Sequence, residues 1–410
     1  MSMPSSARQY FSGALRASRR GASDEAIGLF SQAITAAPGC VAALFNRGRE
    51  YDSLGRHAEA IADYTRCIER EPAADFYYNR ALAYRHLDDF IVALADYDRA
   101  IALEARHVRA WNNRGNVLYL MGDFAAALES YGTCLSIDRG FAPAWYNRGC
   151  AHDELGSYSR ALEDYTRSLA LEKRPEAYYN RALVFRKLKE HARAIEDFSA
   201  AIALNPVFVK ALNNRANAYA DMQQRSRALQ DYCEAIVIDP GCADALYNRG
   251  LAYSAVCDFE QAVADFTQAL EHNPADADAI GARALACWRL GRRQEALDEV
   301  SRALELRPDS ALLYYNRAQM FADEDRLTEA IDDYTCSLGL ETCSAQAWND
   351  RGAAYAALGD YNRAIGDFNR ALELEPGCGD AFDNRAAALE QRRRHFRRRK
   401  EASSFRRCGR

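Results

Sequence analysis

The sequence predicts an all-α protein built from stacked pairs of helices, and three observations indicate this fold class. A five-residue segment returns in identical or similar form every 33 or 34 residues, reading YYNRA at Tyr77–Ala81, Tyr178–Ala182 and Tyr314–Ala318. Apolar and small residues recur within each repeat at helical spacing. A proline closes seven of the repeats. Since a fixed period of this length is typical of stacked supersecondary units, we expect one array rather than separate domains.

Each repeat reads as two helices joined by a short turn. With residue 41 as position 1 of the second repeat, the first helix is expected at positions 2–14 and the second at about 18–30. Position 8 is always Gly or Ala, position 20 is always Ala, and position 27 is Ala, Ser or Cys, so helix backbones can approach closely. Large side chains at positions 4, 11 and 24 fill the space between them. Proline at position 32 ends the second helix because it has no amide hydrogen.

In chain order, we expect a short N-terminal extension at residues 1–6 and eleven repeats at 7–378. A further first helix at 379–391 would cap the stack, and a basic tail would follow at 392–410. Repeat 1 has Gly13 and Leu29 where most others have Arg and an acid, which suits a terminal cap. Repeat 9 has Gly281 and Ala282 in place of an aromatic residue and asparagine.

Composition and charge indicate an ordered protein without a membrane span and with an uneven distribution of charge. Of the 410 residues, 49% are hydrophobic and 27% are charged, as in ordered globular proteins. No apolar run reaches the ~18 residues of a membrane span, and the N-terminus lacks the features of a secretory signal. The twelve cysteines occur singly, which favours reduced thiols in the cytosol or nucleus. Residues 391–410 carry +9, which leaves −14 on the remainder of a chain whose net charge is −5.

The repeat resembles the tetratricopeptide repeat. The resemblance rests on Trp, Leu or Tyr at position 4, Gly or Ala at 8, Tyr at 11, Ala at 20, Phe or Tyr at 24, Ala at 27 and Pro at 32. The segment AWYNRGCAHDELGSYSRALEDYTRSLALE, which begins at Ala144, is similar to one such repeat almost throughout. The resemblance implies a right-handed α-α superhelix, the TPR solenoid, in which the first helices line a concave groove that holds segments of partner proteins.

An arginine at position 7 and an acid at position 23 form two further columns. Arginine occupies position 7 in every repeat from Arg47 to Arg385, and position 23 is acidic in each full repeat after the first except at Ser130. A partly buried guanidinium needs a carboxylate partner, so these columns predict a ladder of structural ion pairs. The sequence leaves open whether each arginine pairs within its own repeat or with the repeat before.

The asparagine at position 6 is the main candidate for ligand contact. The resemblance implies that positions 2, 5, 6, 9, 12 and 13 face the groove. An amide both donates and accepts hydrogen bonds, so a column of them can hold the backbone of an extended chain. Tyrosines at position 5 are suited to anchor a ligand. The alternatives are that the asparagines bond a neighbouring helix and the tyrosines belong to the core. The predicted groove residues are Asn46, Asn79, Asn113, Asn147, Asn180, Asn214, Asn248, Asn316, Tyr78, Tyr146, Tyr179, Tyr247 and Tyr315.

Chaperone-binding arrays of this family hold a C-terminal carboxylate with a clamp spread over three consecutive repeats. That clamp needs Lys at position 5 of its first repeat, and no repeat here has one. Asn116 and Asn217 stand at position 9, and Arg109 and Lys210 at position 2, but no three consecutive repeats complete the set. A function as chaperone co-factor or adaptor is therefore the least favoured of the binding functions.

Catalytic and metal sites are not indicated. The seven histidines are scattered over different repeat positions, and no His, Cys, Asp or Glu set has metal-ligand spacing. No phosphate loop, nucleophile motif or catalytic carboxylate pair occurs. We therefore expect neither an enzyme nor a bound metal or cofactor.

The arginine-rich tail is the second candidate binding site. It continues the capping helix, so Arg392–Lys400 are expected to form a basic helical extension that then frays. It is interpreted either as a solvated tail, or as a site for nucleic acid, anionic lipid or an acidic protein segment, or as a nuclear-import signal. Our leading prediction is a non-catalytic scaffold or adaptor in the cytoplasm that binds partner polypeptides in its groove. Binding of acidic partners through the tail, with nuclear import, is the alternative; the oligomeric state is left open. The tail residues are Arg392, Arg393, Arg394, Arg397, Arg398, Arg399 and Lys400.

Overall fold

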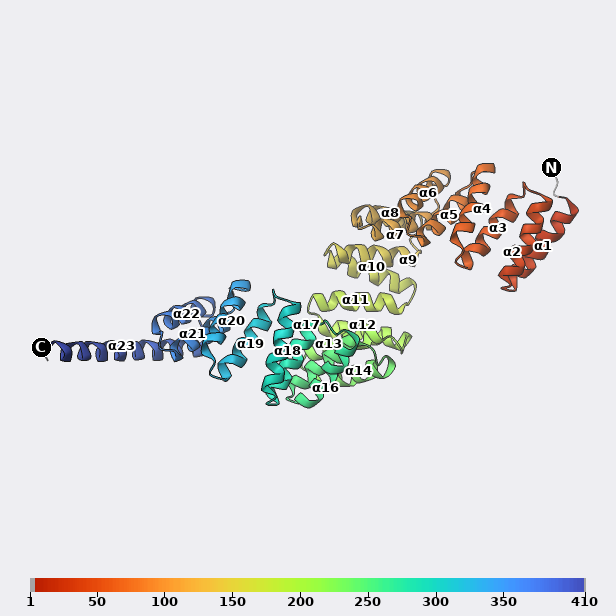
Figure 1. Ribbon diagram of the computed structural model, residues 1–410. Coiled ribbons are helices and arrows are strands. Elements are labelled where there is room, and N and C mark those ends of the chain that lie inside the picture. Colours follow the sequence, from red (N-terminus) through yellow and green to blue (C-terminus); the bar gives the residue numbers. More distant parts are fainter. Residues whose placement is uncertain (1–3, 409–410) are drawn as a thin grey trace. The chain divides into compact units, whose positions relative to one another are not determined.

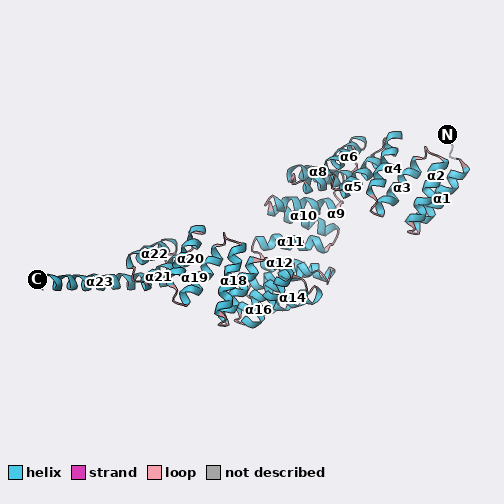
Figure 2. Ribbon diagram, in the orientation of Figure 1, coloured by secondary structure: helices cyan, strands magenta, loops and turns pink. Residues whose placement is uncertain are grey.

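The computed structural model describes residues 4–408, and their side chains as far as Arg397. Within this range every regular element is an α-helix (Figures 1 and 2). The chain divides into two compact parts, Met1–Pro206 and Val207–Arg410, which we call the N-terminal half and the C-terminal half. The prediction of an all-α fold made of helix pairs is confirmed.

The N-terminal half contains repeats 1–6. Each repeat consists of an odd-numbered first helix and an even-numbered second helix that packs against it. The helices are α1 (Ser5–Arg19), α2 (Ser23–Ala36), α3 (Val41–Ser53), α4 (His57–Arg70), α5 (Ala74–His86), α6 (Phe90–Leu103), α7 (Val108–Leu120), α8 (Phe124–Ile137), α9 (Ala142–Glu154), α10 (Tyr158–Leu171), α11 (Pro175–Lys187) and α12 (His191–Leu204).

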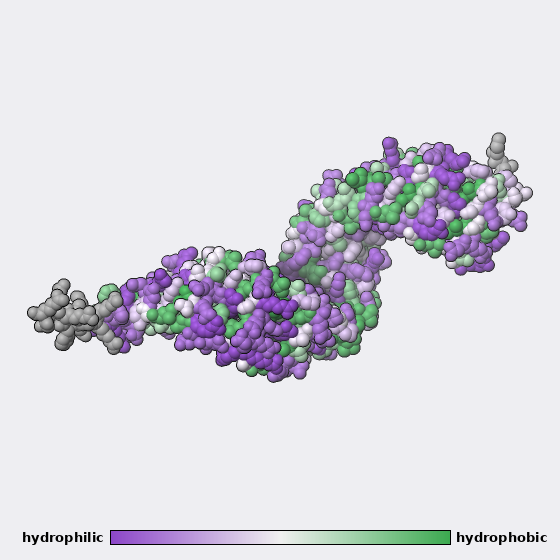
Figure 3. Space-filling model, viewed as in Figure 1, coloured by the Kyte–Doolittle hydropathy of each residue, from purple (hydrophilic) through white to green (hydrophobic). Residues whose placement is uncertain are grey.

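The C-terminal half contains repeats 7–11 and one final helix, in the same alternation. Its helices are α13 (Val209–Asp221), α14 (Arg225–Ile238), α15 (Ala243–Ala255), α16 (Phe259–His272), α17 (Ala277–Arg289), α18 (Arg293–Leu306), α19 (Ala311–Asp323), α20 (Leu327–Leu340), α21 (Ala345–Ala357), α22 (Tyr361–Leu374) and α23 (Gly379–Cys408). Hydrophilic residues dominate the visible face over α16 and α18 (Figure 3).

The turn within each repeat has one fixed backbone feature. Position 15 has a positive φ in all eleven repeats, which is the left-handed conformation that terminates a helix. Six repeats place glycine there, as at Gly55 (φ 74°), whereas five use another residue, such as Lys189 (φ 61°) or Cys257 (φ 62°). Repeats without a glycine thus adopt the same turn, at the steric cost of a Cβ atom in this conformation.

Close packing inside a repeat depends on the small residue at position 8. The ring at position 24 presses on it: a Cβ atom added at Gly115 would lie 2.5 Å from Cε1 of Tyr131, and one at Gly250 would lie 2.6 Å from Cε1 of Phe266. The aromatic residues at position 24 are almost fully buried. The predicted pairing of small and large positions therefore builds the core of each repeat.

Buried cysteines at position 27 serve the same packing. Cys67 and Cys134 are fully buried free thiols, and they donate to the carbonyl oxygens of Val41 and Val108 at 3.6 and 3.3 Å. Burial raises the pKa of each thiol to about 12. Because only the thiolate is strongly nucleophilic, these two residues are structural.

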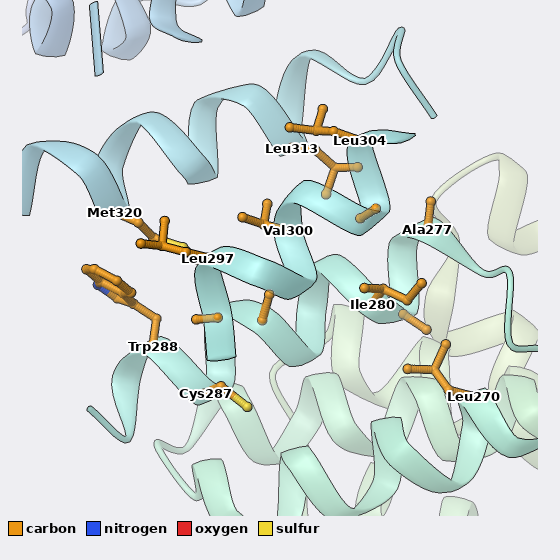
Figure 4. Close-up of a cluster of buried hydrophobic side chains, with 14 residues drawn as sticks. Leu270, Ala277, Ile280, Cys287, Trp288, Leu297, Val300, Leu304, Leu313 and Met320 are labelled. Atoms are coloured by element: carbon orange, nitrogen blue, oxygen red, sulfur yellow. The ribbon is translucent and has the colours of Figure 1, made fainter. Parts of the chain in front are cut away.

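Repeat 9 packs differently from the others. Val300 replaces the ring at position 24, and Leu313 of α19 packs on Gly281, where an added Cβ atom would require the leucine side chain to shift. The result is a large cluster of buried hydrophobic side chains from α16 to α19 (Figure 4). Trp288 lies at one end of this cluster, near Met320 and Leu297 (Figure 4).

The final helix continues beyond the length expected for a cap. α23 runs from Gly379 to Cys408, so residue 391 does not mark the end of a helix. Residues 380–408 contain no glycine or proline and are rich in Ala and Arg, which have high helix propensity. Along the part of the chain that the structure describes, none of the helices has the length and hydrophobicity required to cross a lipid bilayer.

Candidate functional site

The arginine column forms bidentate ion pairs within repeats. Arg47 Nε donates to Asp63 Oδ2 and Nη2 donates to Oδ1, both at 2.7 Å, and Asp63 is 2% exposed. This hydrogen bond raises the pKa of Arg47, against the opposing effect of burial. The predicted ladder is confirmed, and in nine repeats the acid belongs to the arginine's own repeat. The pairs are Arg47–Asp63, Arg80–Asp96, Arg148–Asp164, Arg181–Asp197, Arg215–Asp231, Arg249–Asp265, Arg283–Glu299, Arg317–Asp333 and Arg351–Asp367.

The same arginines also reach the preceding repeat. Arg47 Nη1 donates to Ser31 Oγ at 2.9 Å, and Arg80 Nη1 donates to Thr65 Oγ1 at 3.0 Å. These hydroxyls stand at position 25 of the repeat before. One guanidinium therefore joins the two helices of its own repeat and the second helix of its neighbour, a role suited to its five donors.

Repeat 4 keeps this arrangement with its acid in a different place. Ser130 stands at position 23, and Arg114 Nε instead donates to Asp98 Oδ1 of repeat 3 at 2.7 Å, while its Nη1 donates to Ser130 Oγ at 2.7 Å. Asp98 is the only acid at position 25 in the sequence. That exception in the position-25 column was the signal that could have identified the partner of Arg114.

Several predicted asparagines form hydrogen bonds across the junction between repeats. Asn113 Nδ2 donates to the hydroxyl of Tyr78 at 3.1 Å, and Asn180 Nδ2 donates to that of Tyr146 at 2.8 Å. Where position 5 is itself asparagine, its Oδ1 accepts the bond. Asn147 donates in this way to Asn112, and Asn248 to Asn213, each at 3.1 Å. These contacts correspond to the alternative interpretation, in which the column sets the stacking.

Other members of the asparagine column bond their own helix. The amides of Asn46, Asn79 and Asn214 donate to the backbone carbonyls of Ala42, Asp75 and Lys210, four residues earlier, at 2.7, 2.6 and 2.9 Å. All three side chains remain partly exposed. The column is therefore not uniform, and its members differ in what they contact.

The tyrosines at position 5 are half-buried. Each ring packs on the ring at position 24 of its own repeat with centroids 5.8–6.0 Å apart, for the pairs Tyr78–Tyr97, Tyr146–Tyr165, Tyr179–Phe198, Tyr247–Phe266 and Tyr315–Tyr334. Burial raises the pKa of Tyr78 and of Tyr247. These side chains thus contribute to the core and expose one edge among the first helices.

A pocket of about 420 Å³ lies within the C-terminal half, and we call it the Asn316 pocket. One predicted groove residue, Asn316, lines this pocket. The pocket is formed mainly by the first helices α17, α19 and α21, with α20 beneath them. Its lining residues are Leu285, Trp288, Arg289, Asn316, Gln319, Met320, Ala322, Asp323, Leu327, Tyr334, Asp350, Ala353 and Ala354.

Both apolar and polar side chains line the Asn316 pocket, which is partly open to solvent. Trp288 is 7% exposed, and its Nε1 donates to Asp323 Oδ2 at 3.1 Å. Asp350 stands at position 6 and accepts a hydrogen bond from the hydroxyl of Tyr315 in the preceding repeat at 2.8 Å. At other junctions an asparagine at position 6 bonds the equivalent tyrosine. A concave surface with apolar side chains beside a few fixed polar groups is typical of ligand sites.

Sequence reasoning missed most of this pocket. Repeat 9 has Trp288 at position 12 and Cys287 at position 11, where most repeats have an aromatic residue at 11. Ala353 and Ala354 at positions 9 and 10 of repeat 11 leave space opposite it. The displaced tryptophan and the alanine-rich helix were the available signals, but only stacking brings them together.

The groove positions carry different charge in the two halves. In repeats 1–6 these positions hold seven bases and five acids, a net charge of +2. In repeats 7–11 and the first thirteen residues of α23, they hold two bases, Lys210 and Arg289, and eight acids, a net charge of −6. Those acids are Asp221, Asp244, Asp278, Asp323, Asp350, Asp380, Asp383 and Glu390. The Asn316 pocket lies within this acidic face.

The basic residues after position 391 lie on α23. Arg392 Nη1 donates to Asn362 Oδ1 at 3.3 Å, and Arg394 pairs with Glu390 one turn earlier. Arg393 and Arg397 are exposed, and Phe396 between them is 65% exposed. The side chains of the predicted tail residues Arg398, Arg399 and Lys400 lie outside the described residues.

Comparison with known proteins agrees with the repeat pattern. Models of the tetratricopeptide repeat match residues 41–73, 74–107, 108–141, 142–174, 175–208, 209–242, 243–276, 282–335 and 345–378. Among solved structures, a tetratricopeptide repeat protein from Parabacteroides merdae is 20% identical with a TM-score of 0.51, and the match covers 60% of this chain and 98% of that one. The Cut9–Hcn1 hetero-tetramer of the APC/C is 14% identical with a TM-score of 0.51, covering 94% and 97%. These likenesses show the fold.

Proposed function

Because this chain belongs to the tetratricopeptide-repeat family, we propose that it is a non-catalytic scaffold that binds segments of partner polypeptides along its first helices. The observation that carries the proposal is the Asn316 pocket, which places a predicted ligand-contact residue beside about 420 Å³ of open space. A side chain of the bound segment would enter the pocket. The segment itself would follow the groove positions of α17, α19 and α21.

The polar groups around the pocket suit a polypeptide ligand. The amides of Asn316 and Gln319 both donate and accept hydrogen bonds, so they can pair with backbone N–H and C=O groups of any sequence. The apolar lining residues Trp288, Met320 and Leu327 would select a hydrophobic side chain at one position. Backbone contacts would then supply general affinity, and the pocket would supply specificity.

The other predicted groove residues extend this site. The half-buried tyrosines at position 5 present rigid ring edges, and the amides of Asn46, Asn79 and Asn214 remain partly exposed on the first helices. Asparagines such as Asn147 and Asn248, which bond the preceding repeat, would act mainly by holding the spacing of the groove. Mutation of the tyrosines, or of Asn46, Asn79 and Asn214, is expected to weaken binding of the partner segment directly.

The test is to fill the pocket without disturbing the core. Ala353 lines the pocket and is exposed, so Ala353→Trp should occupy the space that a ligand side chain needs. Thr328→Trp adds the same bulk at an exposed position of the second helix α20 and is the matched control. Peptides selected from a display library on the unmodified protein would be titrated against all three forms by calorimetry.

We expect Ala353→Trp to weaken peptide binding at least about a hundredfold, which corresponds to ~2.7 kcal/mol, while Thr328→Trp leaves it unchanged. Circular dichroism would check that both variants fold. Selection of no peptide, or equal affinity in all three forms, would show that the pocket is not a polypeptide site.

The alternative function, binding of an acidic partner through the C-terminal arginines, is favoured by the exposure of Arg393 and Arg397 on α23. Its test is binding of a single-stranded oligonucleotide to the whole chain and to a form that ends at Gln391. A steep dependence on salt that is lost with the truncation would support this function, because each phosphate contact releases counterions.

A further inference from the structure

We propose that the C-terminal helix of one copy of this protein binds in the acidic groove of the C-terminal half of a second copy, with Phe396 in the Asn316 pocket. The inference rests on the proposed function, because it names an occupant for the same pocket. Four features carry it: the reach of α23, the exposure of Phe396, the shape of the pocket and the opposite charges of the two surfaces.

The second part of α23 extends beyond the helices that hold its beginning. Ala388 is the last buried residue of the described part of the helix, and Arg392 makes a contact with Asn362 of α22. From Arg393 to Arg397 the described side chains are exposed. Since a helix rises 1.5 Å per residue, Phe396 lies about 12 Å further along the axis than Ala388. Figure 1 shows this segment projecting past α21 and α22.

A continuous helix cannot return to its own pocket. The pocket lies on α17, α19, α20 and α21, whereas α23 leaves the stack after packing on α21 and α22. Residues 380–408 contain neither glycine nor proline at which the helix could readily break. Binding within one copy would require several turns of helix to unfold, so a second copy is the favoured source of the ligand.

Phe396 has the chemistry of a hot-spot residue. Its ring is 65% exposed, and its neighbours one turn before and one residue after are Arg392, Arg393 and Arg397. An exposed aromatic ring loses contact with water when it enters an apolar pocket, which stabilises a complex. The volume of the Asn316 pocket, about 420 Å³, is sufficient for a phenylalanine side chain, and Trp288, Met320 and Leu327 would contact it.

The charges around the pocket complement those around Phe396. Without the three acids of α23 itself, the groove positions of the C-terminal half hold five acids and two bases, a net charge of −3, and residues 391–410 carry +9. Asp323 is on the pocket rim; its Oδ2 accepts from Trp288 Nε1, and its other oxygen can accept a hydrogen bond from a guanidinium. Arg289 is the only base among the lining residues. Helical neighbours three and four residues before Phe396 share its face, so Arg392 and Arg393 would approach this rim together.

The N-terminal half provides a contrast that sharpens the assignment. Its groove positions carry +2, so they would repel a segment of +9 rather than attract it. The helix should therefore bind in the C-terminal half and leave the groove of the N-terminal half free for another polypeptide.

This contact is heterologous, because helix and pocket are different surfaces of the same chain. Each copy could bind one neighbour through its pocket and another through its helix, which gives a closed ring or an open chain. Binding of the helix would also compete with any foreign segment for the Asn316 pocket.

The test uses two full-length variants that are each defective in one surface. Ala353→Trp fills the pocket and leaves α23 intact, and Phe396→Ser removes the aromatic ring and leaves the pocket intact. Sedimentation velocity would be measured for the unmodified protein, for each variant alone and for an equal mixture, at low and high salt. Thr328→Trp is again the control for added bulk.

We expect the unmodified protein to associate, with affinity reduced at least about tenfold at high salt. Each variant alone should remain monomeric, and the mixture should form a dimer and nothing larger, because only one pocket and one helix remain functional. Association of the unmodified protein that persists in both single variants would overturn the proposal, and so would a mixture that stays monomeric.

The two proposals fail in different ways. If the unmodified protein is monomeric but still binds selected peptides that Ala353→Trp rejects, the pocket is a polypeptide site and the second-copy assignment is wrong. If the complementing mixture forms a dimer but no foreign peptide binds, the pocket serves self-association and the scaffold function is wrong.

Discussion

The N-terminal and C-terminal halves are built from the same repeat, yet their first helices present opposite charge. Both contain the ladder of arginines and acids, the left-handed residue at position 15 and the small residue beneath the ring at position 24. At the groove positions, however, one half carries +2 and the other −6, and the Asn316 pocket belongs to the second.

This difference shows that, in a repeat protein, one set of residue positions stabilises the fold and another set is available to bind partners. Residues that hold a helix pair together must meet the same neighbours in every repeat, so they have the same chemistry in both halves. Groove positions meet solvent or ligand and are free to differ. Identical core positions should therefore have equal effects in the two halves, while their surfaces bind different partners.

The largest effect is expected from the ring at position 24. Phe198 in the N-terminal half and Phe266 in the C-terminal half are both fully buried, and each packs on a position-5 tyrosine at 5.8 Å. Replacing either by alanine leaves a cavity and should destabilise its repeat by about 4 kcal/mol. Hydrogen exchange followed by mass spectrometry, which resolves each repeat, would measure the loss. If the two losses of unfolding free energy differed by more than ~1 kcal/mol, the cores of the two halves would not be equivalent.

The next largest effect on stability is expected when an acid of the ladder is removed, and its size should depend on how deeply that acid is buried. Asp164 has a side chain 3% exposed, whereas Asp98, the partner of Arg114, is 53% exposed. Asp164→Ala leaves a partly buried guanidinium unpaired and should cost about 3 kcal/mol. Asp98→Ala should cost less than about 1 kcal/mol, because water screens that pair.

Chemical denaturation and local hydrogen exchange would compare these two variants. Asp265→Ala in the C-terminal half is the matched variant of Asp164→Ala and should behave like it. If Asp98→Ala were as damaging as Asp164→Ala, the arrangement in repeat 4 would be as tightly coupled as the common one.

A smaller, stabilising effect is expected at the turns without glycine. Lys189 in the N-terminal half and Cys257 in the C-terminal half have φ values of 61° and 62°, where a Cβ atom is strained. Lys189→Gly and Cys257→Gly should each raise stability by about 1 kcal/mol. The midpoint of thermal unfolding would measure the gain, with Gly55→Ala as the reverse control. A loss of stability would mean that side-chain contacts at these turns outweigh the backbone strain.

The smallest effect is a pH dependence confined to the N-terminal half. His152 is 8% exposed, and burial lowers its pKa while Asp164 opposes this shift. The unfolded chain therefore binds the proton first as pH falls, and stability is lost from about pH 6.5 downward, until the lowered pKa is passed. His152→Phe, which supplies the apolar residue usual at position 11, should remove this loss.

Thermal unfolding of the unmodified protein and of His152→Phe, at neutral and mildly acidic pH, would test this prediction. His86, the other histidine whose pKa is lowered, lies on α5 in the same half and is retained in both, so only the difference between the two proteins reports on His152. An equal decline in the two would assign the pH dependence to other groups.

Much of the fold could be predicted because the period marks equivalent positions. The prediction of a first helix at positions 2–14 is one residue off from α3, which covers positions 1–13 (Val41–Ser53), and the ladder followed from two aligned columns. The exchange of partners at Arg114 was not predicted, because its acid belongs to another repeat and another position. Long-range pairings of this kind depend on which helices the stack places side by side.

The candidate site was less predictable than the fold. The asparagine column was predicted to contact either a ligand or a neighbouring helix; within it, Asn113 donates to Tyr78 of the preceding repeat, while Asn46 donates to Ala42 of its own helix. Identical residues thus have different partners: Tyr78 stands at position 5 before Asn113 and accepts its hydrogen bond, whereas Phe11 stands there before Asn46 and has no polar side-chain atom. The Asn316 pocket likewise depends on side chains from three successive repeats.

The sequence by itself determined the repeat length, the two helices of each repeat, the alternation of small and large core residues and the opposite charges of body and tail. These properties are local or periodic, so they can be identified from the amino-acid sequence alone. Only the tertiary structure decided the partner of each arginine, the role of each asparagine, the position of the pocket and the reach of α23. The arginine pairs join residues 16 apart in the chain and the asparagine bonds join residues 34 or 35 apart, so both depend on how the helices and the neighbouring repeats stack.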